Sequence, residues 1–437
     1  MQLKNTIGGS LAAATCGLLG ALPSAPAAAQ EAKDWDIDSS VVYYGEDNSR
    51  VTSYTLDVAI RRALDEDRSW SVNLTVDSLT GATPNGAVPS NTPQTFTGAS
   101  GGESYTVAPG EVPLDPTFLD TRVALTANWQ QALGTSSRWN VGMSASDEYD
   151  YFHIGANTRF EYDFNQKNTT AFVGFAYAQD DIKPVGGAPI GFSPMTGERE
   201  DDNEGDDFRG GGEQSKDVLD ALVGVTQILG RRDVLELTYS YSQADGYLTD
   251  PYKLLSVVDP VTGQPVPAID SEIPYLYLFE HRPDKRTKQA GYVEWRHAFD
   301  RDSLALSARF MTDDWGIDSQ TIEARYRWNI NGDSYLEPQL RWYTQTAADF
   351  YTTVLFDGEA LPEFASADTR LADMDAYTVG AKYAHSTPNG EWSVRLAYYR
   401  QEPNPSPEAL VGDLAGFDEL ILPMTAVIAQ FGYRFKF

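Results

Sequence analysis

The stretch that decides the fold is VIAQFGYRFKF, which occupies residues 427–437 at the end of the chain. One of its faces carries apolar and mostly aromatic side chains, namely Val427, Ala429, Phe431, Tyr433, Phe435 and Phe437. The other face carries Ile428, Gln430, Gly432, Arg434 and Lys436. Because successive side chains of a strand point to opposite faces, the stretch predicts a β-strand with one apolar side. A soluble sheet with such an exposed aromatic row would aggregate, so the pattern favours a strand that faces lipid.

The same period of two recurs upstream, beginning at Trp35. For example, Tyr54, Leu56, Val58 and Ile60 alternate with Thr55, Asp57, Ala59 and Arg61. This period indicates strands, whereas a helical pattern would repeat about every 3.6 residues. We predict about sixteen strands, at roughly residues 34–46, 49–63, 69–80, 118–133, 137–148, 152–164, 168–181, 216–229, 233–246, 287–299, 303–315, 318–330, 334–348, 374–386, 391–402 and 424–437.

Every second connection between these strands is short, and three of the intervening ones, near 47–48, 149–151 and 316–317, are short as well. The short polar ones predict tight turns, at residues 65–68, 134–136, 165–167, 230–232, 300–302, 331–333 and 388–390. The long ones all fall at the intervening positions, near residues 81–117, 182–215, 247–286, 349–373 and 403–423. Outer-membrane barrels sort their connections in this way, with short periplasmic turns at one rim and long extracellular loops at the other. The predicted fold class is therefore all-β, a single antiparallel transmembrane β-barrel; fourteen or eighteen strands stay open as alternatives.

The N-terminus has the features of a secretory signal peptide over residues 1–29. Lys4 supplies the positive start, residues 11–22 form a short apolar core, and three alanines at 27–29 offer a cleavage site. We expect export, with residues 30–437 forming the barrel in the outer membrane of a Gram-negative cell. The only cysteine, Cys16, lies in the removed segment. The mature chain would then lack thiols, which excludes disulfides and cysteine-based metal sites.

The chain is strongly acidic, with a formal net charge of −30. Removal of residues 1–29 makes it one unit more negative, since Lys4 is the only charged side chain there. Phosphates would be repelled, so we expect no nucleic acid partner. A solvated acidic surface and an attraction for cations are the two interpretations of the charge.

Three stretches in the second half resemble a family of Gram-negative bacterial proteins. They are HRPDKR at 281–286, RFMTDDWGIDS at 309–319 and RWYTQTAADFY at 341–351. Together they are similar to the domain of unknown function 3570 family. The resemblance implies an outer-membrane barrel without an assigned activity and without agreed functional residues. The gene neighbourhood of its members implies a periplasmic or lipoprotein partner, with a flavin or redox link.

The matching stretches also supply the candidate site residues. By parity, Arg309 and Asp313 share one strand face, as do Arg341 and Gln345, close to the rim that carries the long loops. We therefore predict lumen or rim positions for Arg309, Asp313, Asp314, Trp315, Arg341, Gln345, His281 and Arg282. The alternative is a salt-bridge ladder that only stiffens the barrel wall. Separately, the alternating aromatics Phe431, Tyr433, Phe435 and Phe437 resemble the C-terminal signal read by the bacterial barrel-assembly machinery, which with outer-membrane lipids is an expected partner.

Enzyme and metal motifs were not found in the sequence. The four histidines, His153, His281, His297 and His385, form no close ligand pair, and neither a nucleophile elbow nor a P-loop is present. We expect no catalytic activity, no metal and no cofactor, although a phospholipase-type barrel would need only a Ser/His pair that sequence cannot assign. The acidic run at 198–207 faintly resembles a calcium loop, but Gly211 stands where its last glutamate should be. Loose Ca²⁺ binding and a solvated loop both stay open for it.

Two functions compete at this point. One is a porin-like channel for small polar or cationic solutes, because a barrel of about sixteen strands can enclose a water-filled lumen. The other is a non-conducting barrel that docks a periplasmic or lipoprotein component. Long loops that fold inward and plug the lumen would favour the second.

Overall fold

A computed structural model describes residues 35–47, 50–96, 104–195, 209–269, 274–404, 411–416 and 421–436. The predicted signal peptide, the acidic run at 198–207 and Phe437 lie outside these residues. Within the described ranges, the helical segments are too short and insufficiently apolar for any of them to cross a membrane.

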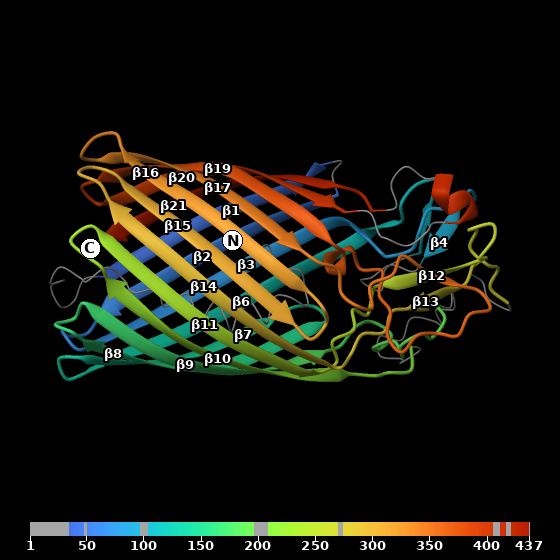
Figure 1. The fold of residues 1–437 in the computed structure, drawn as a ribbon, viewed down its shortest axis with the longest axis horizontal. Coiled ribbons are helices and arrows are strands. Elements are labelled where there is room, and N and C mark those ends of the chain that lie inside the picture. Colours follow the sequence, from blue (N-terminus) through green and yellow to red (C-terminus); the bar gives the residue numbers. More distant parts are fainter. Residues whose placement is uncertain are drawn as a thin grey trace.

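The chain forms a closed antiparallel barrel of sixteen strands, which confirms the predicted fold class (Figure 1). Around the ring the strands are β1 (Trp35–Glu46), β2 (Val51–Ala63), β3 (Arg68–Pro84), β6 (Leu114–Leu133), β7 (Ser137–Asp147), β8 (Tyr151–Phe164), β9 (Thr169–Ile182), β10 (Gln214–Ile228), β11 (Asp233–Gly246), β14 (Lys285–Ala298), β15 (Ser303–Asp313), β16 (Asp318–Asn329), β17 (Ser334–Gln345), β19 (Met374–Thr387), β20 (Gly390–Pro403) and β21 (Met424–Lys436). The ring closes where β21 pairs with β1, from Asp36 opposite Lys436 to Glu46 opposite Ala426.

The outer face of the barrel is apolar and ends in aromatic side chains. Exposed aliphatic residues form its middle, among them Leu125, Val223, Leu306, Val379 and Leu396. By strand register, outward-facing tryptophans gather at the end with the short turns: Trp35, Trp70, Trp129, Trp139, Trp295, Trp328 and Trp392. Tyr43, Tyr54, Tyr177, Tyr377 and Tyr398 face outward toward the other end. An apolar band between two aromatic girdles matches the profile of a bilayer.

The short turns require few residues and lie together at one rim, which is the left end of the barrel in Figure 1. Gly134 has a φ of 75°, and Asn165, Gln166 and Lys167 all adopt positive φ values between 52° and 65°. Positive φ values are favoured by Gly and tolerated by Asn. This explains why the turns at 134–136 and 165–167 begin with Gly134 and Asn165. The chain terminates at the same rim, where Figure 1 marks the C-terminus.

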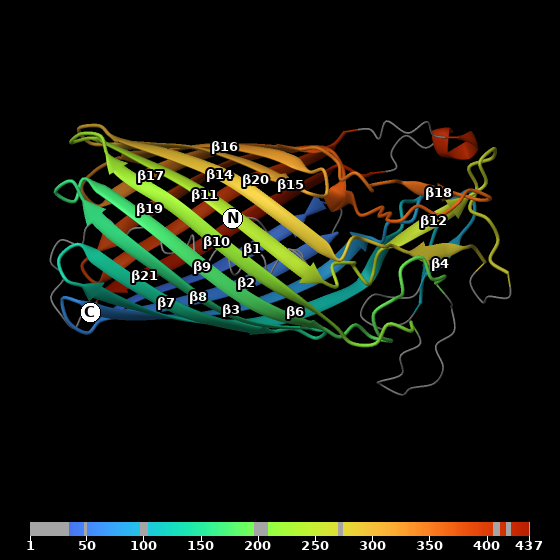
Figure 2. The ribbon, with the colours of Figure 1, turned by 60° about the horizontal axis from the view of Figure 1, so that its bottom comes forward.

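The long connections fold into an ordered cap at the opposite rim, with short strands that the sequence analysis did not predict. The cap contains a sheet of β13 (Tyr277–Phe279), β12 (Leu254–Val258) and β18 (Val354–Phe356), and a hairpin of β4 (Gln94–Phe96) and β5 (Tyr105–Val107). Figures 1 and 2 show these elements beyond the barrel end. The antiparallel pairing of β3 with β6 also continues past a bulge between Gly81 and Thr83.

The cap has its own apolar packing and is also anchored inside the barrel mouth. Phe96, Tyr277 and Leu254 are buried together in one cluster. A second cluster joins Leu248 and Leu371 of the long connections to Ala178, Val218 and Ala244, which face inward from β9, β10 and β11. The cap therefore covers part of the mouth rather than standing free in solvent.

Candidate functional site

The inward face of the barrel carries charges that are separated by sign. Strands β14 to β17 contribute mainly cations, with Arg286, Lys288, Arg296, Arg309, Arg325, Arg327 and Arg341 against the acids Glu294, Asp313, Glu323 and Glu337. Strands β1, β2, β3 and β6 contribute mainly acids, with Asp36, Asp38, Glu46, Asp57, Asp77 and Asp120 against Arg61 and Arg122. In the ring, β7 to β11 and β19 to β21 separate these two groups. The lumen therefore has a basic wall (β14–β17) opposite an acidic wall (β1–β3 and β6).

Many of the inward charges are already paired along the wall. Arg138 lies 2.9 Å from Glu161 and 2.6 Å from Asp163, and Arg159 lies 2.9 Å from Glu161. Similarly, Arg325 contacts both Glu294 at 3.2 Å and Glu323 at 3.0 Å. Such ladders correspond to the structural alternative that the sequence left open.

Two cations of the basic wall, Lys288 and Arg341, have no ion pair with any of the described residues. Lys288 instead faces the like charges of Arg286, Arg309 and Lys216, with Asp313 as the nearby acid. Arg341 faces the hydroxyls of Tyr343 and Tyr399 without an ion pair of its own. On the opposite wall, the carboxylate of Asp57 accepts hydrogen bonds from the uncharged Asn73 and Thr75. The lumen thus keeps charges that the wall does not neutralise.

The candidates at the end of β15 and just after it, Asp313, Asp314 and Trp315, lie at the rim, under the cap. The side chain of Asp313 is fully buried and accepts a hydrogen bond from Arg286 Nε at 2.8 Å. Its other oxygen accepts from the backbone N–H groups of Trp315 and Ile317, which ends the strand two residues earlier than predicted. The Arg286 guanidinium also stacks 4.3 Å from the Trp315 ring centre. The neighbouring carboxylate of Asp314 accepts from the Thr287 N–H at 2.8 Å.

The remaining candidates connect the barrel to the cap or lie within it. Gln345 is buried at the end of β17 and donates to the carbonyl oxygens of Arg370 and Ala372, at 3.0 and 2.8 Å. His281 lies in the cap, away from the barrel wall, with its ring between Phe192 and Phe364. At the seam, Phe431 faces outward with 53% of its surface exposed, and the rings of Tyr433 and Phe435 are 4.3 Å apart.

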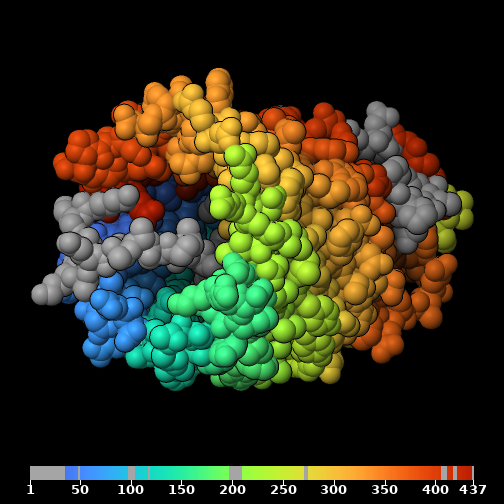
Figure 3. All heavy atoms as spheres, turned by 60° about the vertical axis from the view of Figure 1, so that its left-hand side comes forward, coloured from blue at the N-terminus to red at the C-terminus, as the bar shows by residue number. Residues whose placement is uncertain are grey.

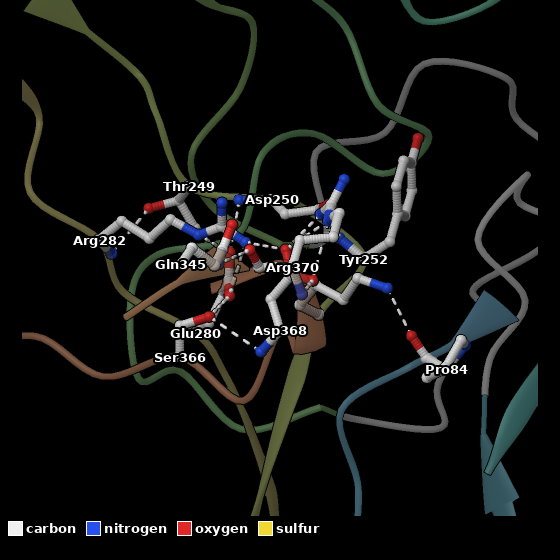
Figure 4. Close-up of polar contacts among 11 residues, drawn as sticks. Pro84, Thr249, Asp250, Tyr252, Glu280, Arg282, Gln345, Ser366, Asp368 and Arg370 are labelled. Carbon is white, nitrogen blue, oxygen red and sulfur yellow. Dashed lines mark hydrogen bonds and ion pairs between the residues drawn. The ribbon is translucent and has the colours of Figure 1, made fainter. Parts of the chain in front are cut away.

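Arg282 belongs to a buried ionic cluster, which we call the cap latch and define as Asp250, Glu280, Arg282, Asp368 and Arg370 (Figure 4). Arg282 lies 2.6 Å from Glu280 Oε1 and 2.6 Å from Asp368 Oδ2, and its side chain is only 4% exposed. Arg370 contacts both Asp368 and Asp250. Since Gln345 of β17 holds the backbone at Arg370, the latch joins two of the long connections, 247–286 and 349–373, to the barrel rim.

Burial and charge act against one another in the latch. Burial raises the pKa of Glu280, and Arg282 offsets this only in part. Burial would also raise the pKa of Asp368, but the guanidinium groups of Arg370 and Arg282 hold that pKa well below its usual range. Sequence analysis identified only Arg282 of this cluster, because its partners are far apart in the chain and follow no periodic pattern.

A second acidic cluster lies at the same rim, near the acidic wall. Glu148, in the turn between β7 and β8, lies 3.9 Å from Arg122, and its side chain is 9% exposed. Burial and the neighbouring Asp120 raise the pKa of Glu148 to about 8. Among the described residues, no group of three or more His, Cys, Asp or Glu side chains is arranged to hold a metal ion.

The comparisons with known proteins identify a family but no activity. The family profile described as "Protein of unknown function (DUF3570)" matches residues 8–435. No curated protein matches the sequence.

Several solved structures are similar in fold. The ferric enterobactin receptor PfeA of Pseudomonas aeruginosa, as its Q482A mutant with enterobactin, is 11% identical, with a TM-score of 0.43 over 92% of this chain and 60% of that one. CdiB from Acinetobacter baumannii is 8% identical, with a TM-score of 0.43 over 92% and 60%. The CymD monoaromatic hydrocarbon channel is 8% identical, with a TM-score of 0.39 over 93% and 89%. The chain spans only 54% of the receptor PfeA bound to BCV-L6.

Proposed function

The chain belongs to the DUF3570 family, and from this premise we propose that it is an outer-membrane channel for small polar solutes whose outer mouth is controlled by the cap. In this proposal the short turns lie in the periplasm and the cap faces the exterior, as in other outer-membrane barrels. Residues 1–29 serve for export.

The observation that carries the proposal is the set of unneutralised charges on the inner wall. A barrel that served only as a membrane anchor would gain nothing from unpaired cations on its inner wall, since burying an unpaired charge is costly. Water and polar solutes that enter the lumen would solvate the charges of Lys288 and Arg341 on one wall and of Asp57 on the other. Opposed basic and acidic walls favour solutes that are polar or carry both signs of charge, rather than cations alone.

The cap explains how such a lumen would be controlled. Its latch is buried and its apolar cluster reaches the inward side chains Ala178, Val218 and Ala244. At the other end, the surface is hollowed between the N-terminal strands (blue) and the C-terminal strands (orange to red), as Figure 3 shows. We therefore expect a lumen that is accessible from the short-turn rim and restricted at the cap.

Ion selectivity in planar bilayers tests the channel proposal. We expect Lys288→Gln together with Arg341→Gln to shift the reversal potential in a potassium chloride gradient toward cation selectivity, because the basic wall loses its unpaired charges. Arg400→Gln is the matched control: Arg400 faces outward on β20 and pairs with Glu402 at 2.5 Å. An equal shift in the control, or the absence of channels in both wild type and a variant with an opened cap, would contradict the proposal.

A second candidate is the non-conducting scaffold, which the covered mouth favours. In that case the folded protein would stay electrically silent even with the cap opened, and a periplasmic or lipoprotein partner would co-purify with it in stoichiometric amount.

A further inference from the structure

Three inward-facing side chains on neighbouring strands form a hydrogen-bonded row near the capped end of the lumen. Ser144 lies on β7, His153 on β8 and Asp180 on β9. Ser144 Oγ is 3.0 Å from His153 Nε2, and His153 Nδ1 is 2.7 Å from Asp180 Oδ1. The register fixes this row, because His153 is directly opposite Asp180 and Ser144 is diagonal to His153.

The row has the connectivity of a serine hydrolase triad, with one histidine nitrogen toward the hydroxyl and the other toward a carboxylate. His153 is 2% exposed and Asp180 is fully buried, so their mutual orientation is held by packing. Ser144 is only half-buried and lies on the lumen side. A nucleophile that is reachable beside a buried base and a buried acid is the arrangement that acyl transfer needs.

Two glycines on the same wall leave room for this chemistry. A Cβ atom at Gly155 would lie 2.8 Å from Ser144 Oγ and 3.2 Å from His153 Nε2, so a side chain there would disturb the contact between them. Gly142 lies two residues before Ser144 on β7, and a Cβ atom there would meet Asn128 Oδ1 and lie 2.7 Å from the amide nitrogen of Asn157, which places that amide beside the lumen near Ser144. Amide N–H groups beside a nucleophile can stabilise the oxyanion of a tetrahedral intermediate.

We propose that Ser144 is a nucleophile with His153 as its general base, and that the barrel hydrolyses small carboxylic esters that reach this end of the lumen. Ser144 Oγ attacks the ester carbonyl carbon while its proton passes to His153 Nε2. The alcohol leaves with that proton, and an acyl group remains on Ser144. Water then attacks the acyl carbon, giving its proton to His153, and the carboxylic acid leaves as Ser144 is reprotonated. Asp180 acts as a positioning residue through His153.

Ser144 faces the lumen whether or not the barrel conducts ions, so the hydrolase and the channel are independent of one another. The sequence led us to expect no catalytic activity, because a sequence cannot pair a histidine with a serine across strands.

The test is covalent labelling of the folded, full-length protein in detergent with a small fluorophosphonate, which forms an O–P bond with an activated serine and releases fluoride. We expect one label, placed on Ser144 by mass spectrometry, and hydrolysis of p-nitrophenyl acetate that Ser144→Ala lowers at least a hundredfold. Gly155→Ala should also slow labelling by more than tenfold, although it changes neither partner. Asp180→Asn should lower the maximal labelling rate while leaving the half-saturating probe concentration unchanged.

The chain offers a matched control in Ser334, whose Oγ is 2.9 Å from His385 Nδ1 but for which no carboxylate contact to that ring is found among the described residues. Ser334→Ala should label and hydrolyse like wild type. Correct folding of each variant is checked by its unheated mobility on gels. Absence of labelling in folded wild type, or equal labelling of Ser144→Ala, would overturn the proposal.

Discussion

Replacing Arg282 by Met is expected to open the cap. The guanidinium of Arg282 is the shared partner of Glu280 and Asp368, whose side chains are 0% and 1% exposed. Removing one member of a buried ion pair leaves an uncompensated charge and costs about 3 to 5 kcal/mol. At about 1.4 kcal/mol per tenfold change, this corresponds to a rise of about two to four orders of magnitude in the equilibrium constant for opening of the cap.

Hydrogen exchange of backbone amides in the cap measures this opening. The amides of Ala348, Ala365 and Arg282 each donate a hydrogen bond within the cap, so their exchange should accelerate together in Arg282→Met. The control is Arg232→Met, which removes an exposed ion pair with Asp300 at a short turn. Exposed pairs contribute only about 0.2 to 1 kcal/mol, so this variant should leave cap exchange unchanged. Unaltered exchange in Arg282→Met would show that the latch does not hold the cap.

Replacing Glu148 by Gln is expected to stabilise the protein in alkaline solution. The pKa of Glu148 is raised from 4.5 to about 8 by burial and by Asp120, so the folded state holds a proton that the unfolded state releases. The contribution of Glu148 to the free energy of unfolding is therefore fully present below about pH 4.5. It falls as the pH rises from there to about 8, and it does not change further above that pH. A permanently neutral glutamine side chain at this position would not show this loss. The largest difference expected between the free energies of unfolding of variant and wild type is on the order of 5 kcal/mol, from about 1.4 kcal/mol per pKa unit.

Urea unfolding at pH 5, 7 and 9 measures the effect as a difference between variant and wild type, in which other titrating groups cancel. The advantage of Glu148→Gln should be small at pH 5 and largest at pH 9. Glu359→Gln is the control, because Glu359 is an exposed glutamate of the cap. A difference that does not change with pH would exclude a protonated Glu148 in the folded protein.

Period two and loop length were enough to predict the barrel. Each strand has one face toward lipid, so the apolar residues at 54, 56, 58 and 60 repeat without interruption and set both the strand and its orientation. The cap lacked any such signal. Its strands are short, and β12 pairs in parallel with β18, which is far away in the chain. Burial of such strands on both sides removes the alternation that sequence analysis depends on.

The site was predictable only in part for the same reason. Parity alone predicted that Arg309 and Asp313 share one strand face, as do Arg341 and Gln345; the strand register places all four on the inward face. Parity cannot show which charges meet across strands or between loops. The partners of Arg282, and the row of Ser144, His153 and Asp180, depend on register and on loop folding, so neither could be read from the chain.

A disulfide across the β1–β21 seam tests the closed barrel most directly. Val42 and Gln430 are directly opposite and both face the lumen, so cysteines there should fall within the range of about 4.4 to 6.8 Å between Cα atoms that a disulfide requires. Because Cys16 is removed at export, the two introduced cysteines are the only thiols of the mature double variant. We expect almost complete cross-linking. After boiling, the cross-linked protein should migrate on a gel as a compact ring, and reductant should convert it to the linear chain. The diagonal pair of Val42 and Gly432 should cross-link poorly. No cross-link at the seam, or equal cross-linking of the diagonal pair, would contradict a barrel closed in this register.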